Sequence, residues 1–241
     1  MYTVVRLEMR NVLIFGIILV LVLVFITAGC VKETPEENNS AENRWNGTWA
    51  SEQYILFILQ NGSEITGSYE PHDIESRDPG LLQGILSEDK EIFSGIWTES
   101  GPVTLVISDD GMSYFGTGGT RPGKITEQSY TYTSNGTRVG PLSDPDNAWS
   151  GTWKSGKTVQ TMIQNGTSVR STYQQVSTEE DEPGLFEGTV SGDGKTLTGK
   201  WMESGNFSFI LSEDGSFWNG TYSVELDESA ETSFWNATKL Q

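Results

Sequence analysis

Two copies of the motif W-x-E-S-G carry the side chains best suited to chemistry in this sequence. The motif places Glu99 two residues after Trp97 and Glu203 two residues after Trp201. Residues two apart share a face of an extended strand, so each carboxylate is expected beside a tryptophan ring. A desolvated carboxylate acts as an acid or holds the polar end of a ligand. The alternative is structural, with each glutamate accepting hydrogen bonds from the Ser-Gly turn that follows it.

Catalysis would need more groups than one copy of the motif supplies. Glycosidase chemistry requires two carboxylates at a fixed separation, and each copy offers one, so a pair has to form across the copies. The single histidine, His72, has Val176 at the matching position of the other copy, which excludes a shared His-dependent triad. One histidine and one cysteine also exclude a His/Cys metal site within the chain. The sequence therefore predicts a non-enzymatic protein without a cofactor or metal.

Both motifs belong to an internal duplication with a constant offset of 104 residues. Residues 45–117 align with 149–221 without a gap, and 26 of the 73 aligned positions are identical. WNGTW matches WSGTW, and GIWTESG matches GKWMESG. We therefore predict two structural units, repeat 1 over 45–139 and repeat 2 over 149–241, joined by the turn-rich segment 140–148.

Each repeat has the pattern of short β-strands. Apolar and polar residues alternate, and Asn-Gly, Ser-Gly or Asp-Gly pairs recur about every 8–12 residues. In repeat 1 we expect eight strands, at 46–50, 54–60, 63–70, 81–87, 91–98, 103–108, 112–117 and 127–133. Tight connections favour antiparallel hairpins, and closure removes exposed edges. The predicted fold is all-β, with two tandem antiparallel eight-stranded up-and-down β-barrels after an N-terminal hydrophobic helix; two-sheet β-sandwiches are the alternative.

The glycine and tryptophan motifs suggest roles within such a barrel. Trp49 and Trp153 are expected to plug one end, and Gly47 and Gly151 to let the chain turn there. The acidic Asp-Gly turns, at 109–111 and 213–215, lack the regular ligand spacing of a calcium loop and are interpreted as hairpin turns.

The order of these short motifs is similar to that of known barrel families. Gly47-Thr48-Trp49, Thr66-Gly67-Ser68-Tyr69 and Ser94-Gly95-Ile96-Trp97 resemble the streptavidin/avidin-like and lipocalin-like families, and repeat 2 supplies counterparts. The resemblance implies a barrel whose tyrosine faces a pocket. At the two positions where that family has an Asn and a Ser that contact biotin, repeat 1 has Ser51 and Ile55 and repeat 2 has Ser155 and Val159. The resemblance therefore does not imply biotin binding. The candidate ligand-binding residues are Tyr69, Trp97, Glu99, Tyr173, Trp201 and Glu203.

The N-terminus indicates export. Arg6 and Arg10 precede an uninterrupted apolar run at 12–28, a pattern typical of an export signal or membrane anchor. The following ITAGC resembles the lipobox of surface lipoproteins, which implies lipidation of Cys30. We predict a signal or anchor over 1–30 and a disordered acidic tether over 31–44. The folded part is expected on the outer face of the cytoplasmic membrane, at the cell surface.

Charge and sequons bear on the partners. A net charge of −18, with 33 acidic against 15 basic residues, argues against nucleic-acid binding. Eight Asn-x-Ser/Thr sequons favour an exported glycoprotein, although Asn-Gly pairs also make hairpin turns; they begin at Asn38, Asn46, Asn61, Asn135, Asn165, Asn206, Asn219 and Asn236. We expect a non-catalytic module at the membrane that binds a surface protein or glycan. The alternatives are a small-ligand carrier and an inhibitor-like module acting through the loops 71–79 and 175–183.

Overall fold

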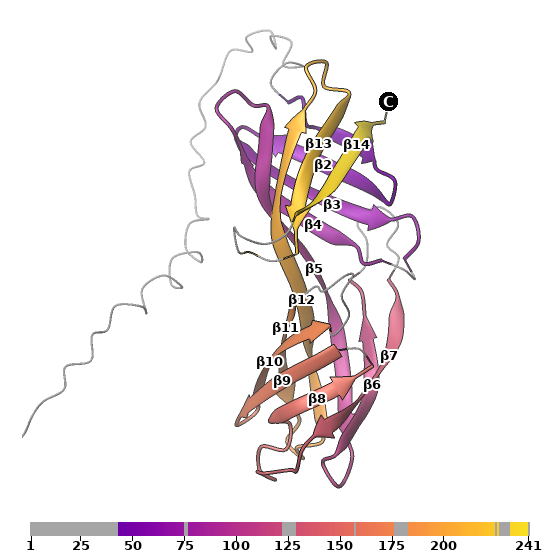
Figure 1. Ribbon diagram of the computed structural model, residues 1–241, viewed down its shortest axis with the longest axis vertical. Coiled ribbons are helices and arrows are strands. Elements are labelled where there is room, and N and C mark those ends of the chain that lie inside the picture. Colours follow the sequence, from indigo (N-terminus) through magenta and orange to yellow (C-terminus); the bar gives the residue numbers. More distant parts are fainter. Residues whose placement is uncertain are drawn as a thin grey trace, which may run out of the picture. The chain divides into compact units, whose positions relative to one another are not determined.

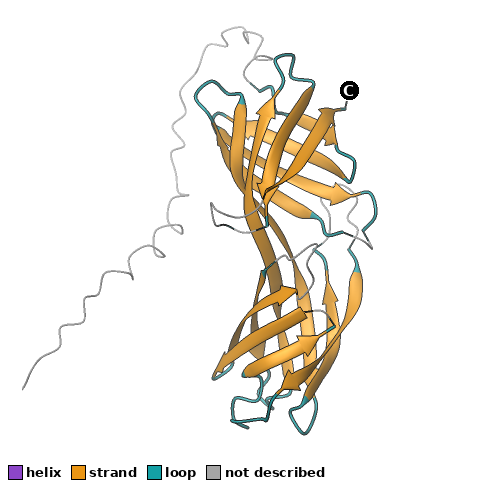
Figure 2. Cartoon of the chain, in the orientation of Figure 1, coloured by secondary structure: helices purple, strands orange, loops and turns teal. Residues whose placement is uncertain are grey.

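A computed structural model describes residues 43–74, 77–121, 129–156, 158–175, 183–224, 226 and 232–240 of the chain. All strand pairings in these residues are antiparallel, and Figure 2 shows strands and loops there, so the all-β prediction is confirmed. Within the same residues, no helix has the length and apolar character needed to cross a membrane. The predicted helix at 12–28, Cys30, Asn38 and the tether up to residue 42 lie outside the described residues.

The described residues form fourteen strands. Their bounds are β1 (Gly47–Ala50), β2 (Tyr54–Asn61), β3 (Glu64–Pro71), β4 (Gly80–Leu86), β5 (Ile92–Ile107), β6 (Ser113–Gly119), β7 (Thr131–Val139), β8 (Gly151–Ser155), β9 (Thr158–Asn165), β10 (Ser168–Gln175), β11 (Gly184–Val190), β12 (Thr196–Leu211), β13 (Phe217–Ser223) and β14 (Thr232–Lys239). Each strand pairs with its neighbours in sequence, and β1 pairs with β14, which closes the sheet into a ring (Figure 1).

Strands β5 and β12 give the ring a second connection. They are sixteen residues long and pair with each other from Ile92 opposite Ile210 to Val106 opposite Thr196. This pairing divides the ring into two closed strand circuits, each of eight strand segments. The first circuit contains β1–β4, residues 92–99 of β5, residues 204–211 of β12, β13 and β14. The second circuit contains residues 100–107 of β5, β6–β11 and residues 196–203 of β12. Figure 1 shows β5 and β12 running from one circuit into the other.

Each circuit combines strands of both repeats. The second circuit is the continuous segment 100–203, which joins the end of repeat 1 to the beginning of repeat 2. The first circuit is assembled from residues before 100 and after 203. The predicted boundaries 45–139 and 149–241 therefore follow the repeats and not the strand circuits.

The predicted hairpin at Glu99-Ser100-Gly101 is wrong, because the expected strands at 91–98 and 103–108 are joined in the single strand β5 (Ile92–Ile107). The corresponding segment of repeat 2 is likewise continuous in β12. The backbone hydrogen bonds that a hairpin would make within one repeat are made instead between the repeats. Glu99 lies opposite Glu203, its own counterpart, so the centre of the β5–β12 ladder is a pseudo-two-fold position.

Two glycines beside this centre make room for tryptophan rings. Gly101 lies opposite Trp201, and Gly205 lies opposite Trp97. A Cβ atom at Gly101 would lie 2.7 Å from Nε1 of Trp201, and one at Gly205 would lie 2.6 Å from Nε1 of Trp97. The backbone comes closer still, since the same Cβ atoms would lie 1.6 Å from the Gly119 carbonyl oxygen and 1.8 Å from the Ser223 carbonyl oxygen, so glycine is required at both positions mainly by the neighbouring backbone.

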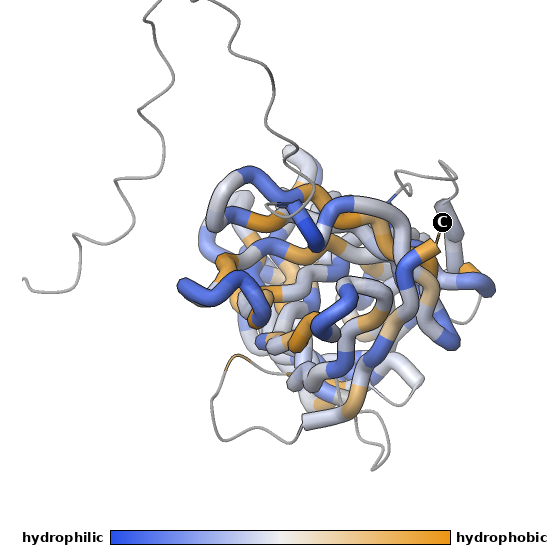
Figure 3. The backbone as a smooth tube through the Cα atoms, turned by 90° about the horizontal axis from the view of Figure 1, so that it is seen from above, coloured by the Kyte–Doolittle hydropathy of each residue, from blue (hydrophilic) through white to orange (hydrophobic). Residues whose placement is uncertain are grey.

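Each circuit surrounds its own hydrophobic cluster, which is formed by every second residue along its strands, the ones that point inward. Figure 3 shows hydrophilic and hydrophobic stretches following one another along the tube. Trp49 and Trp153 are fully buried, as predicted, and Gly47 and Gly151 adopt φ values of 134° and 140°. The Nε1 of Trp49 donates to the Trp45 carbonyl oxygen at 3.0 Å, so the polar edge of the ring is satisfied within the core.

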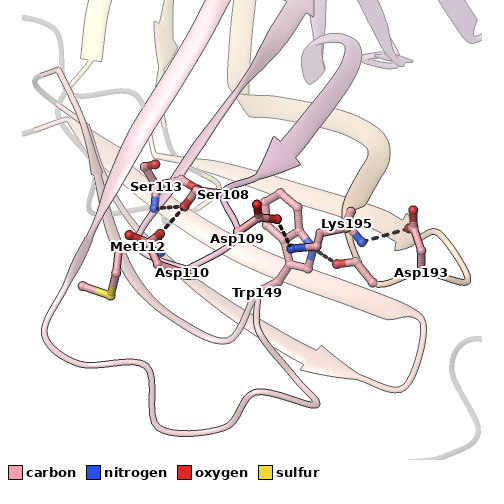
Figure 4. Close-up of polar contacts among 9 residues, drawn as sticks. Ser108, Asp109, Asp110, Met112, Ser113, Trp149, Asp193 and Lys195 are labelled. Carbon is pink, nitrogen blue, oxygen red and sulfur yellow. Dashed lines mark hydrogen bonds and ion pairs between the residues drawn. The ribbon is translucent and has the colours of Figure 1, made fainter.

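The acidic turns at 109–111 and 213–215 are hairpin turns, as the sequence predicts. Oδ1 of Asp110 accepts hydrogen bonds from Ser108 Oγ at 2.6 Å and from Met112 N at 3.0 Å (Figure 4). The Ser108 bond, followed by the Met112 bond, lowers the pKa of the Asp110 carboxyl. Lys195 Nζ lies 2.9 Å from Asp109 Oδ1 and links this turn to the neighbouring one. The carboxylates therefore order the turn.

Candidate functional site

The described residues line a cavity in each strand circuit. The cavity of the first circuit has a volume of about 130 Å³ and is lined by Gln53, Tyr54, Tyr69, Arg77, Trp97, Glu99, Tyr222, Phe234 and Trp235. The cavity of the second circuit has a volume of about 230 Å³. Its lining consists of Asp78, Val103, Leu105, Tyr114, Tyr132, Ser134, Ser155, Thr158, Gln160, Met162, Tyr173, Phe186, Trp201 and Glu203.

The structure brings the six predicted site residues together as two triplets, one in each cavity. The Tyr69 hydroxyl donates to Glu99 Oε1 at 3.0 Å, and the Tyr173 hydroxyl donates to Glu203 Oε1 at 2.7 Å. Each glutamate is thereby tied to a strand two positions away in the ring. The predicted capping of a Ser-Gly turn by these glutamates is wrong, because no turn exists there.

The two tryptophans of the triplets are held at their polar edges. Trp97 Nε1 donates to the Ser223 carbonyl oxygen at 2.7 Å, and Trp201 Nε1 donates to the Gly119 carbonyl oxygen at 2.9 Å. Since the indole N–H is already bonded, what each ring offers the cavity is its apolar surface. Each W-x-E-S-G motif therefore supplies a fixed carboxylate and a fixed aromatic wall.

The larger volume of the second cavity comes from smaller inward residues. Lys239 of β14 pairs with Trp49, and Arg138 of β7 pairs with the equivalent Trp153. Lys239 and Arg138 are therefore equivalent positions. It follows that Trp235 of β14 corresponds to Ser134 of β7. Two further replacements place smaller or more polar side chains in the second cavity. The three pairs, first circuit and then second, are Tyr54 and Thr158, Leu56 and Gln160, and Trp235 and Ser134.

Aromatic rings fill the corresponding space of the first circuit. The Trp235 ring lies with centroid separations between 5.3 and 5.9 Å from the rings of five neighbours, Tyr54, Tyr69, Phe209, Trp218 and Tyr222. Such edge and tilted contacts are typical of a packed aromatic core. The first circuit is thus largely closed by its own side chains.

Part of the second cavity is lined by neutral polar groups. Gln160 Nε2 donates to the Tyr114 hydroxyl at 2.5 Å. The same hydroxyl forms hydrogen bonds with Ser155 and Ser134, while burial raises its pKa above the ordinary value. Hydroxyl and amide groups can both donate and accept, so this cluster is able to bind a hydroxyl or carbonyl group of a ligand.

Another part of the cavity is acidic. Burial, followed by the charge of Glu203 and its hydrogen bond, raises the pKa of Tyr173. Burial of the phenol, followed by the charges of Asp78 and Glu203, raises the pKa of Tyr132 to about 12, although 37% of this residue is exposed. Both phenols are therefore neutral at physiological pH, beside two carboxylates.

Five of the sequon asparagines are exposed, namely Asn61, Asn135, Asn165, Asn219 and Asn236, while Asn46 and Asn206 are half-buried. The side-chain oxygen of Asn46 accepts a hydrogen bond from Gln60 N, which occupies it structurally. The lone histidine, His72, lies 3.2 Å from the Ser51 carbonyl oxygen through Nε2. Across the described ranges, no group of three or more His, Cys, Asp or Glu side chains is arranged to hold a metal ion.

Sequence reasoning missed Asp78, Tyr114, Tyr132, Ser134 and Gln160. A signal for Gln160 is present, since a polar residue replaces Leu56 at an inward position of the aligned repeats. Ser134 lies beyond the gapless alignment, and the contribution of Asp78 depends on how its loop folds.

Comparisons with protein-family models, curated proteins and solved structures give no match for this chain.

Proposed function

We propose that this is an exported, membrane-anchored binding protein whose two strand circuits act as two eight-stranded barrels. The second barrel carries a small ligand, and the first is a packed structural partner. The observation that carries the proposal is the cavity of about 230 Å³, lined by a neutral polar cluster and by the Tyr173–Glu203 pair.

The size of the cavity supports a small ligand. If each water-sized group takes about 30 Å³, the cavity has room for roughly eight such groups. An eight-stranded barrel has an interior that is either filled by side chains or holds one small ligand. The first circuit is closer to the filled case, and the second has the larger space for a ligand, which favours a carrier over a module with two solid cores.

The arrangement of the carboxylates supports binding without catalysis. Glu99 and Glu203 lie opposite each other in the ladder but line different cavities, so they do not flank one ligand. The Tyr173 hydroxyl donates to Glu203 Oε1, which holds this carboxylate in place as a binding group.

The N-terminal sequence supports attachment to the outer face of the membrane, through a helix or a lipid on Cys30. The exposed sequons are compatible with glycosylation at the surface. A surface protein or glycan bound through the loops is the second candidate partner, as expected for an inhibitor-like module.

The test is native mass spectrometry of the protein purified from its host membranes. We expect a small-molecule adduct that the Ser134→Trp variant loses. This change gives the second cavity the tryptophan that the first circuit has at the equivalent position, Trp235, and so fills the space for a ligand. Thr133→Trp is the matched control, because Thr133 is the exposed neighbour of Ser134 and points to the other face. A wild-type protein without any adduct, or an adduct retained by Ser134→Trp, would contradict the proposal.

A further inference from the structure

We propose that Asn135, Asn219 and Asn236 carry N-linked glycans, and that the first sugar of each glycan packs on an exposed phenylalanine ring beside its asparagine. This inference rests on the export that the proposed function includes, because Asn-x-Ser/Thr is the acceptor sequence of exported chains. It selects three of the eight sequons and gives their glycans a structural role. It is carried by the position of these sequons within strands and by the residues that neighbour them in the ladders.

Two of the other sequons are explained by hairpin geometry. Asn61 and Asn165 are the last residues of β2 and β9, and the glycines that follow them have φ values of 65° and 60°. Asn-Gly is a favoured sequence for such tight turns. The asparagines of the proposal lie inside strands instead, Asn135 in β7, Asn219 in β13 and Asn236 in β14. Turn chemistry therefore does not account for these three sequons.

The glycine in two of the strand sequons has a different role from a turn glycine. A Cβ atom at Gly136 would lie 2.5 Å from the Tyr114 ring, and one at Gly220 would lie 2.0 Å from the Ser208 carbonyl oxygen. Close packing against the neighbouring strand therefore requires both glycines. This packing explains the glycines, but it does not explain the exposed asparagines that precede them.

The β13–β14 hairpin carries two of these sequons on its outer face. Asn219 and Asn236 are exposed and lie directly opposite each other in the ladder, and Figure 1 shows the two strands side by side. Phe217 precedes Asn219 by two residues. Phe234 precedes Asn236 by the same spacing. Residues two apart share a strand face at a distance of about 7 Å, which one sugar ring linked to the asparagine can span. Because the strands are antiparallel, two glycans that lean on these rings diverge.

In the second circuit, the neighbouring strand supplies the ring. Asn135 of β7 is equivalent to Asn236 of β14. Thr133 stands where β14 has Phe234, but Phe115 of β6 lies directly opposite Asn135. Residues directly opposite each other in an antiparallel pair have Cβ atoms about 5 Å apart. A strand sequon and a phenyl ring therefore occur together in both circuits, although the ring comes from different strands.

The three phenyl rings present apolar surface to solvent. The exposed fraction is 62% for Phe115, 43% for Phe217 and 89% for Phe234, although phenylalanine is among the residues most often buried. A sugar ring has a face made of C–H groups, and stacking this face on a phenyl ring removes apolar surface of both from water. The sugar hydroxyl groups remain in solvent. A glycan on the neighbouring asparagine is therefore an occupant that fits each ring.

The modification takes its sugar from a lipid-linked glycosyl phosphate through a membrane transferase of the host. The side-chain amide nitrogen of the asparagine forms a bond to the anomeric carbon of the sugar and loses one proton. The bond between the anomeric carbon and the phosphate oxygen breaks, and its electron pair leaves with the lipid phosphate. The acceptor sequence requires a hydroxyl residue two positions after the asparagine. All three sequons have threonine there, namely Thr137, Thr221 and Thr238.

The first test is glycopeptide mass spectrometry of the full-length protein purified from its host membranes. We expect glycans at Asn135, Asn219 and Asn236. Thr238→Ala should abolish the glycan at Asn236, because it destroys the sequon. Thr238→Ser is the matched control, which keeps the sequon and should keep the glycan. Unmodified asparagines at all three strand positions would overturn the inference.

The role of the ring is tested by a double-mutant cycle on Phe234 and Thr238. Loss of the Asn236 glycan in Thr238→Ala, compared with Thr238→Ser, should raise the equilibrium constant of unfolding by about fivefold. In the Phe234→Ser background, the same comparison should give a change below about twofold, because the glycan has no ring to cover. The two positions are four residues apart on β14, about 13 Å, so any coupling between them reports the glycan. Equal effects in both backgrounds, measured by urea unfolding, would overturn the packing on the ring.

Failure of this inference is distinguishable from failure of the proposed function. Labelling of intact cells with a membrane-impermeant amine reagent tests export by itself. A labelled chain without glycans at the three positions would overturn the inference and leave export standing. An unlabelled chain would overturn export and this inference together. The adduct that Ser134→Trp removes tests the carrier separately.

Discussion

Arg138 provides a quantitative test of how the two repeats are joined. It belongs to repeat 1, and its guanidinium carbon lies 4.2 Å from the ring centroid of Trp153 in repeat 2. It donates to the carbonyl oxygens of Gly111 at 2.8 Å and Ser150 at 2.6 Å, and also to that of Ala148. Only 8% of the residue is exposed. Replacement by methionine keeps much of the apolar stem and removes all four interactions.

The expected loss follows from these contacts. Three hydrogen bonds from a charged donor and one cation–π contact together contribute about 4 kcal/mol to the free energy of unfolding, at about 1 kcal/mol each. Burial of the guanidinium lowers its pKa, a desolvation cost that offsets about 1 kcal/mol. We therefore expect Arg138→Met to reduce the free energy of unfolding by about 3 kcal/mol.

Lys239 is the matched residue of the first circuit. Its Nζ lies 5.1 Å from the Trp49 ring centroid and donates to the Arg44 carbonyl oxygen at 2.8 Å. Since an ammonium group cannot reproduce the fork of a guanidinium, Lys239→Met should cost only about 1–1.5 kcal/mol. Urea unfolding of both variants, followed by fluorescence and circular dichroism, measures the difference. Equal losses, or a loss below about 1 kcal/mol for Arg138→Met, would refute the reasoning.

Three further predictions concern the ladder, its central glycines and the acidic part of the second cavity. In a variant lacking Cys30, Ser94→Cys with Ser208→Cys should form an intrachain disulfide on oxidation, because these residues lie opposite each other in β5 and β12; peptide mapping of the unreduced protein detects it. Gly101→Ala should lower thermal stability strongly, whereas Gly192→Ala, whose added Cβ would meet nothing within 4 Å, should not. Tyr132 should titrate near pH 12, measured as the absorbance difference between the wild type and Tyr132→Phe. Because its pKa is raised in the folded state, its contribution to the free energy of unfolding should be lost as the pH rises from 10.0 toward 12.

The disulfide experiment has a matched alternative. If each repeat closed on itself, Ser94 would face Thr104, the counterpart of Ser208, across a hairpin. Ser94→Cys with Thr104→Cys should therefore give no intrachain disulfide in the structure described here. A disulfide in this pair, with none between positions 94 and 208, would mean that the repeats form independent barrels.

The sequence by itself determined the features that depend on neighbouring residues. Alternation along each segment correctly predicted strands, and it placed Trp97 and Glu99 on one face, which is the buried face of β5. The same local chemistry predicted the Asp-Gly turns and the need for glycine at Gly47 and Gly151, where the φ angles are positive. These properties follow from side-chain periodicity and backbone freedom within a few residues, so one sequence is enough to infer them.

Only the tertiary structure decided which strand lies beside β5. The segment 99–101 is compatible with a hairpin within its repeat, and also with a continuous strand paired to β12, because the repeats present nearly equivalent partners. The contrast between a filled and an open cavity was likewise decided by distant residues. Ser134, Gln160 and Glu203 come from three strands and line one cavity only because β5 pairs with β12. Choices among such partners depend on long-range packing, which local pattern does not encode.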